Sequence, residues 1–165
     1  MNITAKDVNE LRKKTGAGMM DCKKALQESN GDLEAAIDFL RKKGQKIAAK
    51  RGDRDAKEGL VISKSSGNTG YLICLNCETD FVAKNNDFGN FANAILDLAI
   101  TNSSLNLDDL LNSNYTGSDL SVAEKITEQS GVIGEKIEIS YFERISAERV
   151  VAYNHPGNQI ASMAV

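Results

Sequence analysis

Apolar residues in the first 45 positions recur at the spacing of helices. Val8 and Leu11 share one helical face after Thr4, which suits an N-cap, and Asp7 in the first turn complements the helix dipole. The glycine-containing segment 15–18 is typical of a helix end. The pattern therefore predicts a first short helix that starts after Thr4.

Two further helices follow in the same pattern. The second starts near Met19, places Met19, Cys22 and Leu26 on one side, and ends at the Asn-Gly pair 30–31. Asp32 caps the third, whose apolar positions are Leu33, Ala36, Ile37 and Leu40, and Gly44 is predicted to close it. The pattern predicts a three-helix domain over residues 1–45.

The pattern changes after a strongly charged stretch, 46–58, which we interpret as a helical linker. The pattern predicts a β-hairpin around a polar turn, formed by residues 60–62 and 71–77. It also predicts strands over residues 136–141, 149–154 and 160–165. Helical spacing begins near residue 80, where the apolar positions are Phe88, Phe91, Ile95, Leu98 and Ala99. Further helices are predicted over residues 107–111 and 118–130, and Ser118 or Ser121 would cap the second of these. The prediction is an α+β protein with a helix-packed antiparallel sheet over 59–165.

Composition places the chain among cytoplasmic proteins. With 41% hydrophobic and 26% charged residues it can bury a core, and it has no apolar run long enough for a membrane helix or a signal peptide. Its three cysteines are too few for a disulfide scaffold, which indicates reduced thiols. We expect no membrane association.

Charge is distributed unevenly. Residues 1–54 carry 13 Lys and Arg against 8 Asp and Glu, whereas residues 55–165 carry 7 against 15. A basic first module suits an acidic partner, either protein or nucleic acid, although solvated lysine-rich helix faces explain the same counts.

The sequence gives little evidence of a catalytic site. His155 has no nucleophile or carboxylate partner in its Pro-Gly turn, and the sequence contains no phosphate-binding loop. Cys74 and Cys77 form a Cys-x-x-Cys without a second ligand pair, within a strand pattern, so we interpret them as buried small hydrophobic residues. We expect no enzymatic activity, no cofactor and no metal.

The junction between the strand 71–77 and the next helix is more informative. Thr79 or Asp80 can cap this helix, and Phe81 follows in its first turn. Phe81 either folds inward with Phe88 and Phe91 or is displayed to solvent, and the pattern does not choose between these positions. An exposed aromatic beside an acidic residue is typical of an interface anchor.

Two segments carry a resemblance to a known family. They are LRKKTGAGMMDCKKAL (11–26), continuing through NGD (30–32) and LRKKG (40–44), and NCETDFVA (76–83). Together they resemble the bacterial elongation factor Ts family, the guanine nucleotide exchange factors of the GTPase elongation factor Tu. Weaker similarity runs through residues 133–135 and His155 to the last residue.

The resemblance implies a role for each segment. The first module would be a ubiquitin-associated-like domain that docks on elongation factor Tu, with contacts from Arg12, Met19, Met20 and Lys23. The second segment would promote GDP release: Phe81 would wedge near the magnesium and phosphate site, flanked by Thr79, Asp80 and Val82, so that GTP can rebind. Ile133, Gly134 and His155 also match interface positions of the family. The chain itself would bind no nucleotide and no nucleic acid.

Alternatives stay open at this point. Nothing here corresponds to the second core module, coiled-coil insertion and C-terminal helix of longer family members, which predicts a truncated chain or a short form. A protein-binding adaptor without exchange activity is therefore the main alternative, and a homodimer through the α+β domain is another. RNA binding by the basic head has little support, because residues 1–38 contain no aromatic residue and Phe39 falls within an apolar helical run.

Overall fold

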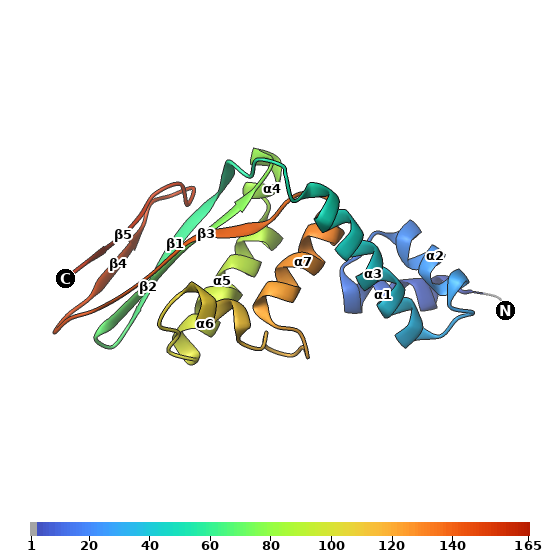
Figure 1. Cartoon of the computed structure of the whole chain (residues 1–165), viewed down its shortest axis with the longest axis horizontal. Helices are drawn as coiled ribbons and strands as arrows, with labels where there is room; N and C mark the ends of the chain where they lie inside the picture. Colours follow the sequence, from blue (N-terminus) through green and yellow to red (C-terminus); the bar gives the residue numbers. More distant parts are fainter. Residues whose placement is uncertain (1–2) are drawn as a thin grey trace. The chain divides into compact units, whose positions relative to one another are not determined.

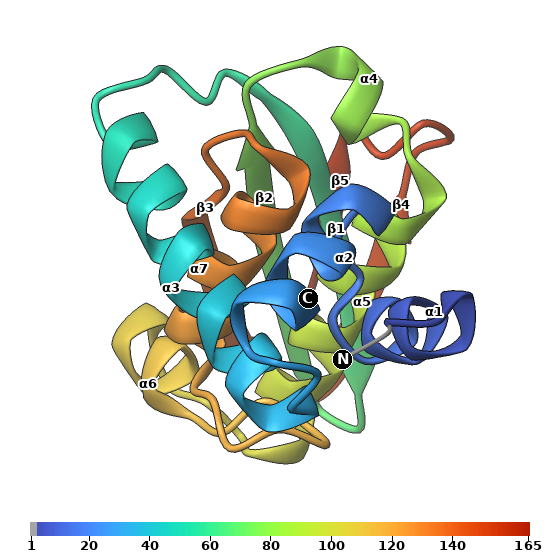
Figure 2. The same cartoon turned by 90° about the vertical axis from the view of Figure 1, so that its right-hand side faces the viewer.

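A computed structural model describes residues 3–165 (Figures 1 and 2). These residues form two compact units. The first unit contains the described residues up to Gly52 together with Thr127–Glu135, and the second contains Asp53–Ile126 and Lys136–Val165. No helix within residues 3–165 is both long enough and apolar enough to cross a membrane. The structure confirms an α+β protein with N-terminal helices followed by antiparallel sheets packed against helices; the domain boundaries at 45 and 59 stay predictions.

Helices α1 (Ala5–Thr15), α2 (Met19–Glu28) and α3 (Leu33–Arg51) begin the first unit. Thr4 caps α1 in a capping box: its Oγ1 accepts from the Asp7 amide at 3.3 Å, and its own amide donates to Asp7 Oδ2 at 2.9 Å. These bonds from Thr4 hold the pKa of Asp7 below its usual range. Asp32 caps α3 as predicted. The small core contains Val8, Leu11, Ala17, Cys22, Ala25, Leu26 and Ala36.

The segment after Gly44 is helical as far as Arg51, as the predicted helical linker implies, but Gly44 does not close the third helix, because α3 runs through it without a break. Gly44 is buried and faces Gly131 of α7 (Val122–Ile133), where a Cβ on Gly131 would lie 2.2 Å from the Gly44 Cα. The two glycines allow the helix backbones to touch, so Gly44 serves packing and not termination.

The second unit is built on strands β1 (Glu58–Ser66), β2 (Thr69–Cys77) and β3 (Glu138–Ser146) in the order β1-β2-β3, all antiparallel. The predicted hairpin is confirmed, with Gly67 at φ +57° in its turn. The β2–β3 register shifts between Cys74 and Leu75. The predicted alternation along β3 therefore stops near this irregularity, and Ser140 and Tyr141 are both exposed.

Helix α5 (Asn86–Thr101) covers one face of the sheet through Phe88, Phe91, Ile95, Leu98 and Ala99, all buried as predicted. Strands β4 (Val151–Asn154) and β5 (Ala161–Ala164) form a second sheet that packs against β1 and β2. Buried Ser63 donates its hydroxyl to Asn154 Oδ1 at 3.1 Å. Short α6 (Leu107–Asn112) follows α5, and α7 begins at Val122 with Ser121 at its cap position, where Ser121 Oγ accepts from the Glu124 amide at 3.2 Å.

Candidate functional site

The candidate site is the α4 turn, which we define as residues 79–84. Helix α4 (Asp80–Ala83) follows β2 directly and contacts β1, β2 and α5 (Figure 1). Of the two residues that the sequence allowed as the cap, the structure selects Thr79, whose side chain accepts from the Val82 amide at 3.5 Å. Thr79 therefore holds the start of this single helical turn.

Asp80 forms an ion pair inside the turn. Lys84 Nζ donates to Asp80 Oδ2 at 2.7 Å across one helical turn. The hydrogen bond and the charge of the partner lower the pKa of Asp80 and raise the pKa of Lys84. Lys84 was not among the predicted site residues, although its i+4 spacing from Asp80 is the signal that would have found it.

Phe81 is displayed to solvent. Its side chain is 83% exposed, whereas Phe88 and Phe91 are 2% and 8% exposed in the core. The structure thus chooses the outward position that the sequence left open. Val82 is half-buried. A fully presented phenyl ring on a short capped turn is suited to inserting between elements of another protein.

Partly buried polar contacts fix the backbone that leads into this turn. Cys77 is fully buried and donates its Sγ hydrogen to the Thr79 carbonyl at 3.2 Å. Glu78 Oε1 accepts from the Lys136 amide at 2.7 Å, which ties the turn to the start of β3. The Cys-x-x-Cys is thus partly as predicted, because Cys77 is buried while Cys74 is half-buried beside Asn76. Among residues 3–165 no cluster of His, Cys, Asp and Glu could hold a metal ion.

His155 lies at the same end of the sheet as the α4 turn. It is exposed in the β4–β5 turn, with Nδ1 3.1 Å from the Tyr153 hydroxyl. The same turn is held against the start of β1, because the Gln159 side chain donates to the Gly59 carbonyl at 3.0 Å. Gly59 pairs with Asn76 near the end of β2, just before the α4 turn (Figure 1). The fold therefore brings Phe81, the main predicted contact residue, and His155, one of the weaker predictions, to the same edge of the sheet.

The predicted docking residues form a second surface, on α1 and α2 of the first unit. We call Arg12, Met19, Met20 and Lys23 the helical surface; all four are exposed. Met19 has the helical spacing of Cys22 and Leu26, but its side chain is 57% exposed, and that of Met20 is 77% exposed. Ala17 and Ala25 occupy the core beside Cys22 instead, so both methionines are available for contact.

Local hydrogen bonds fix the loop between α1 and α2, next to the helical surface. Gly16 ends α1 with φ +71°, and the Thr15 hydroxyl donates to the Leu11 carbonyl at 2.8 Å. Cys22 Sγ donates to the Ala17 carbonyl at 3.6 Å, and burial raises the pKa of this thiol. Cys22 is consequently a neutral core residue and not a reactive thiol.

The remaining predicted contacts, Ile133 and Gly134, lie at the end of α7 in the first unit. Ile133 is half-buried. Gly134 has φ +81° and donates its amide to the Ser130 carbonyl at 2.9 Å, the geometry of a helix C-cap. A glycine at this position suits the left-handed conformation that ends α7, and the role of Gly134 as a contact stays a prediction.

The described residues present two surfaces with exposed apolar side chains: Phe81 on the α4 turn, and Met19 and Met20 on the helical surface. The family model for elongation factor TS matches residues 78–165, which include the whole α4 turn. The chain is 56% identical over 161 residues to elongation factor Ts of Christiangramia forsetii, covering 96% of this chain and 57% of that protein. Against elongation factor Ts of Amoebophilus asiaticus it is 52% identical over 163 residues, covering 98% and 58%.

The third comparison, with elongation factor Ts of Rhodopirellula baltica, gives 50% identity over 158 residues, covering 96% of this chain and 48% of that protein. The chain belongs to the elongation factor Ts family, as its two sequence segments predicted. It spans about half the length of the curated relatives that it matches.

Proposed function

We propose that this chain is a non-enzymatic guanine nucleotide exchange factor that binds elongation factor Tu and accelerates GDP release during translation elongation in the cytoplasm. One observation carries the proposal: Phe81 is 83% exposed at the tip of a capped turn, within the segment that matches the family. An exposed phenylalanine costs solubility, and a presented ring is what a binding factor uses as an anchor.

The chemistry of exchange is a matter of coupled binding equilibria. Phe81 inserts between helices of the GTPase near its magnesium and phosphate site, and Asp80, held by Lys84, keeps the turn in the presenting conformation. An exchange factor that prefers the nucleotide-free GTPase lowers the affinity of the GTPase for GDP. Bound GDP lowers the affinity of the GTPase for the exchange factor by the same ratio. GDP leaves faster, and GTP rebinds.

The helical surface supplies affinity for the GTPase in this proposal. Methionine side chains adapt to the shape of a partner, and arginine is frequent among interface residues that dominate binding energy. Met19 and Met20 are exposed beside Arg12 and Lys23. His155, Ile133 and Gly134 would add contacts.

The exchange step is tested by stopped-flow release of fluorescent GDP from elongation factor Tu. The full chain should accelerate release, and Phe81→Ala should reduce the acceleration at least about tenfold, a barrier change of about 1.4 kcal/mol. Leu105→Ala is the matched control, because Leu105 is also a large exposed apolar side chain, at 66%, outside the candidate site. Equal acceleration by the Phe81→Ala variant and the parent chain would refute the wedge.

Docking is tested separately from exchange. Arg12→Ala and Met20→Ala should raise the concentration of chain needed for half-maximal acceleration while leaving the maximal rate intact, with exposed Lys6→Ala as a control on α1. A lower maximal rate with unchanged half-saturation would contradict the assignment of the helical surface to affinity.

An adaptor that binds elongation factor Tu without exchange is the second candidate, because the chain spans about half of its relatives' length. Its signature in the same experiment is saturable binding with no acceleration of GDP release. A homodimer through the second unit stays a prediction; sedimentation across a concentration series measures it.

A further inference from the structure

We propose that the first unit carries an additional binding surface, for single-stranded RNA, formed by a lysine stripe and one aromatic ring. The lysine stripe is Lys24 of α2 with Lys42, Lys46 and Lys50 of α3, and the ring is Phe39. All four lysines are exposed. None of these residues belongs to the helical surface or to the α4 turn, so the surface is additional to the proposed exchange function.

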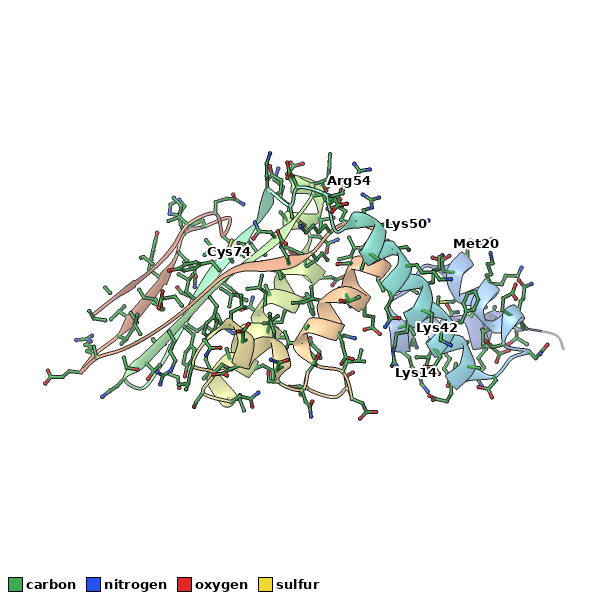
Figure 3. All side chains as sticks on the ribbon, in the orientation of Figure 1. Lys14, Met20, Lys42, Lys50, Arg54 and Cys74 are labelled. Carbon is green, nitrogen blue, oxygen red and sulfur yellow. The ribbon has the colours of Figure 1, made fainter. Side chains whose placement is uncertain are left out.

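The stripe follows from the spacing of basic residues on α3. Phe39, Lys46 and Lys50 are separated by seven and four positions, so they share one helical face, and Lys42 lies beside them. Four residues of helix rise about 6 Å, so Lys42, Lys46 and Lys50 present regularly spaced charges along the axis. Figure 3 shows Lys42 and Lys50 on α3. Residues 39–51 contain no acidic residue.

The charges of the stripe are uncompensated within the unit. Neighbouring cations are paired: Lys43 with Asp21, and Arg41 with Asp38 at 3.5 Å. In residues 3–165 neither Lys24, Lys42, Lys46 nor Lys50 forms an ion pair. Lysines without an ion-pair partner, three of which line one hollow, attract a polyanion.

A hollow lies at the beginning of the stripe. It has a volume of about 320 Å³ and is lined by Lys24, Phe39, Lys42, Lys43 and Lys46. The sequence argued against base stacking because Phe39 falls within an apolar helical run. In the structure Phe39 is only half-buried: one part packs on the helical core and another lines this hollow. An aromatic wall surrounded by cations is the arrangement that holds an unpaired base and its flanking phosphates.

The composition of the stripe favours RNA over an acidic protein. Lysine is depleted at protein–protein interfaces, where arginine, methionine and aromatic residues are enriched. Arginine also matches carboxylates better because it binds them with two parallel hydrogen bonds, whereas lysine binds phosphate as a point charge. The helical surface, with Arg12, Met19 and Met20, has the composition of a protein-binding surface. The lysine stripe has the composition of a phosphate-binding surface.

The test is fluorescence anisotropy of a labelled oligo(U) RNA of about 12 nucleotides with the full chain. Four phosphate contacts predict that log K falls with log salt at a slope of about −3 between about 50 and 200 mM salt. Lys42→Gln/Lys46→Gln/Lys50→Gln should weaken binding at least about tenfold and reduce the slope to about −1. Lys6→Gln/Lys13→Gln/Lys14→Gln on α1 removes the same charge from the same unit and should change both values little. Circular dichroism verifies that each variant is folded.

The aromatic contact is tested with Phe39→Leu, which keeps an apolar side chain toward the core. This variant should bind oligo(U) about fivefold more weakly, with an unchanged salt slope and unchanged binding of an abasic ribose-phosphate strand. Undetectable RNA binding at low salt would overturn the proposal, as would equal losses in the two lysine triple variants. Tighter binding of poly-glutamate than of RNA would overturn it in favour of an acidic protein partner.

Discussion

The helical surface and the α4 turn both expose apolar side chains, but they hold them differently. Met19 and Met20 are flexible side chains at the start of α2, whose N-cap Gly18 makes no side-chain capping bond. Phe81 is a rigid ring on a turn that is capped by Thr79, tied by the Asp80–Lys84 pair and bonded to buried Cys77. An adaptable surface suits affinity, since it can fit a partner with little strain. A fixed ring suits a task that depends on where the ring goes.

The support beneath the two surfaces differs as well. The helical surface rests on a core of small residues and two leucines, whereas the α4 turn contacts β1, β2 and α5 at a sheet with fully buried Ile73 and Leu75. A small helical unit whose core has few large apolar side chains is marginally stable. We therefore expect docking to be the more fragile of the two activities when the core is disturbed.

The largest effect should come from Leu26→Ala in the core of the first unit. Leu26 is 1% exposed, so the substitution should lower the free energy of unfolding by about 3 kcal/mol and abolish docking. Met20→Ala, on the surface of the same helix, should change stability by less than about 0.5 kcal/mol. Urea unfolding measures both, and hydrogen exchange should show the α4 turn unchanged in each. Loss of protection at the turn in Leu26→Ala would contradict the separate support of the two surfaces.

A smaller effect is expected where α3 and α7 touch in the first unit. Gly131→Ala places a Cβ 2.2 Å from the Gly44 Cα, which should cost about 1–2 kcal/mol of stability. Gly44→Ala meets Gly131 at an ordinary 3.5 Å and removes a glycine from a helix interior, so it should be neutral or stabilising by up to about 1 kcal/mol. Thermal unfolding of the pair measures this asymmetry. Equal destabilisation by the two variants would disprove the contact.

Local signals predicted most of the fold. The Thr4 and Asp32 caps, the hairpin around residues 65–70 and the buried face of α5 depend on neighbours in sequence, and the structure confirms them. The failures depend on residues far along the chain. Gly44 was predicted to end a helix because nothing in its neighbourhood indicates that Gly131 packs on it.

The candidate site divides in the same way. A cap at Thr79 or Asp80 and the exposure of at least one of Met19 and Met20 followed from helix geometry, and the structure selects Thr79 and exposes both methionines. The outward position of Phe81 did not follow from helix geometry, since an aromatic in a first helical turn fits either the core or the solvent until the sheet and α5 are in place.

The cap of the α4 turn should have a moderate effect on exchange alone. Thr79→Ala removes the side chain that accepts from the Val82 amide, which should destabilise the presenting turn by about 1 kcal/mol. The acceleration of GDP release should then fall about fivefold. Thr79→Ser keeps the hydroxyl and is the matched control. Docking affinity should be unchanged in both, and an equal loss in the Ser variant would show that the methyl group, not the cap, matters.

The smallest effect concerns the ion pair beside Phe81. Because Lys84 holds the pKa of Asp80 below its usual range, Lys84→Gln should raise that pKa toward the ordinary value of an aspartate. The sign follows from linkage. The ion pair stabilises the turn at pH values above the ordinary pKa of an aspartate, and this stabilisation is lost as the pH falls through the lowered pKa of Asp80. Carboxyl-detected NMR titration measures the shift, and Lys57→Gln, whose partner is Asp55, is the control that should leave Asp80 unchanged. An Asp80 pKa that does not move in Lys84→Gln would mean that the cap and Cys77 alone hold the ring in place.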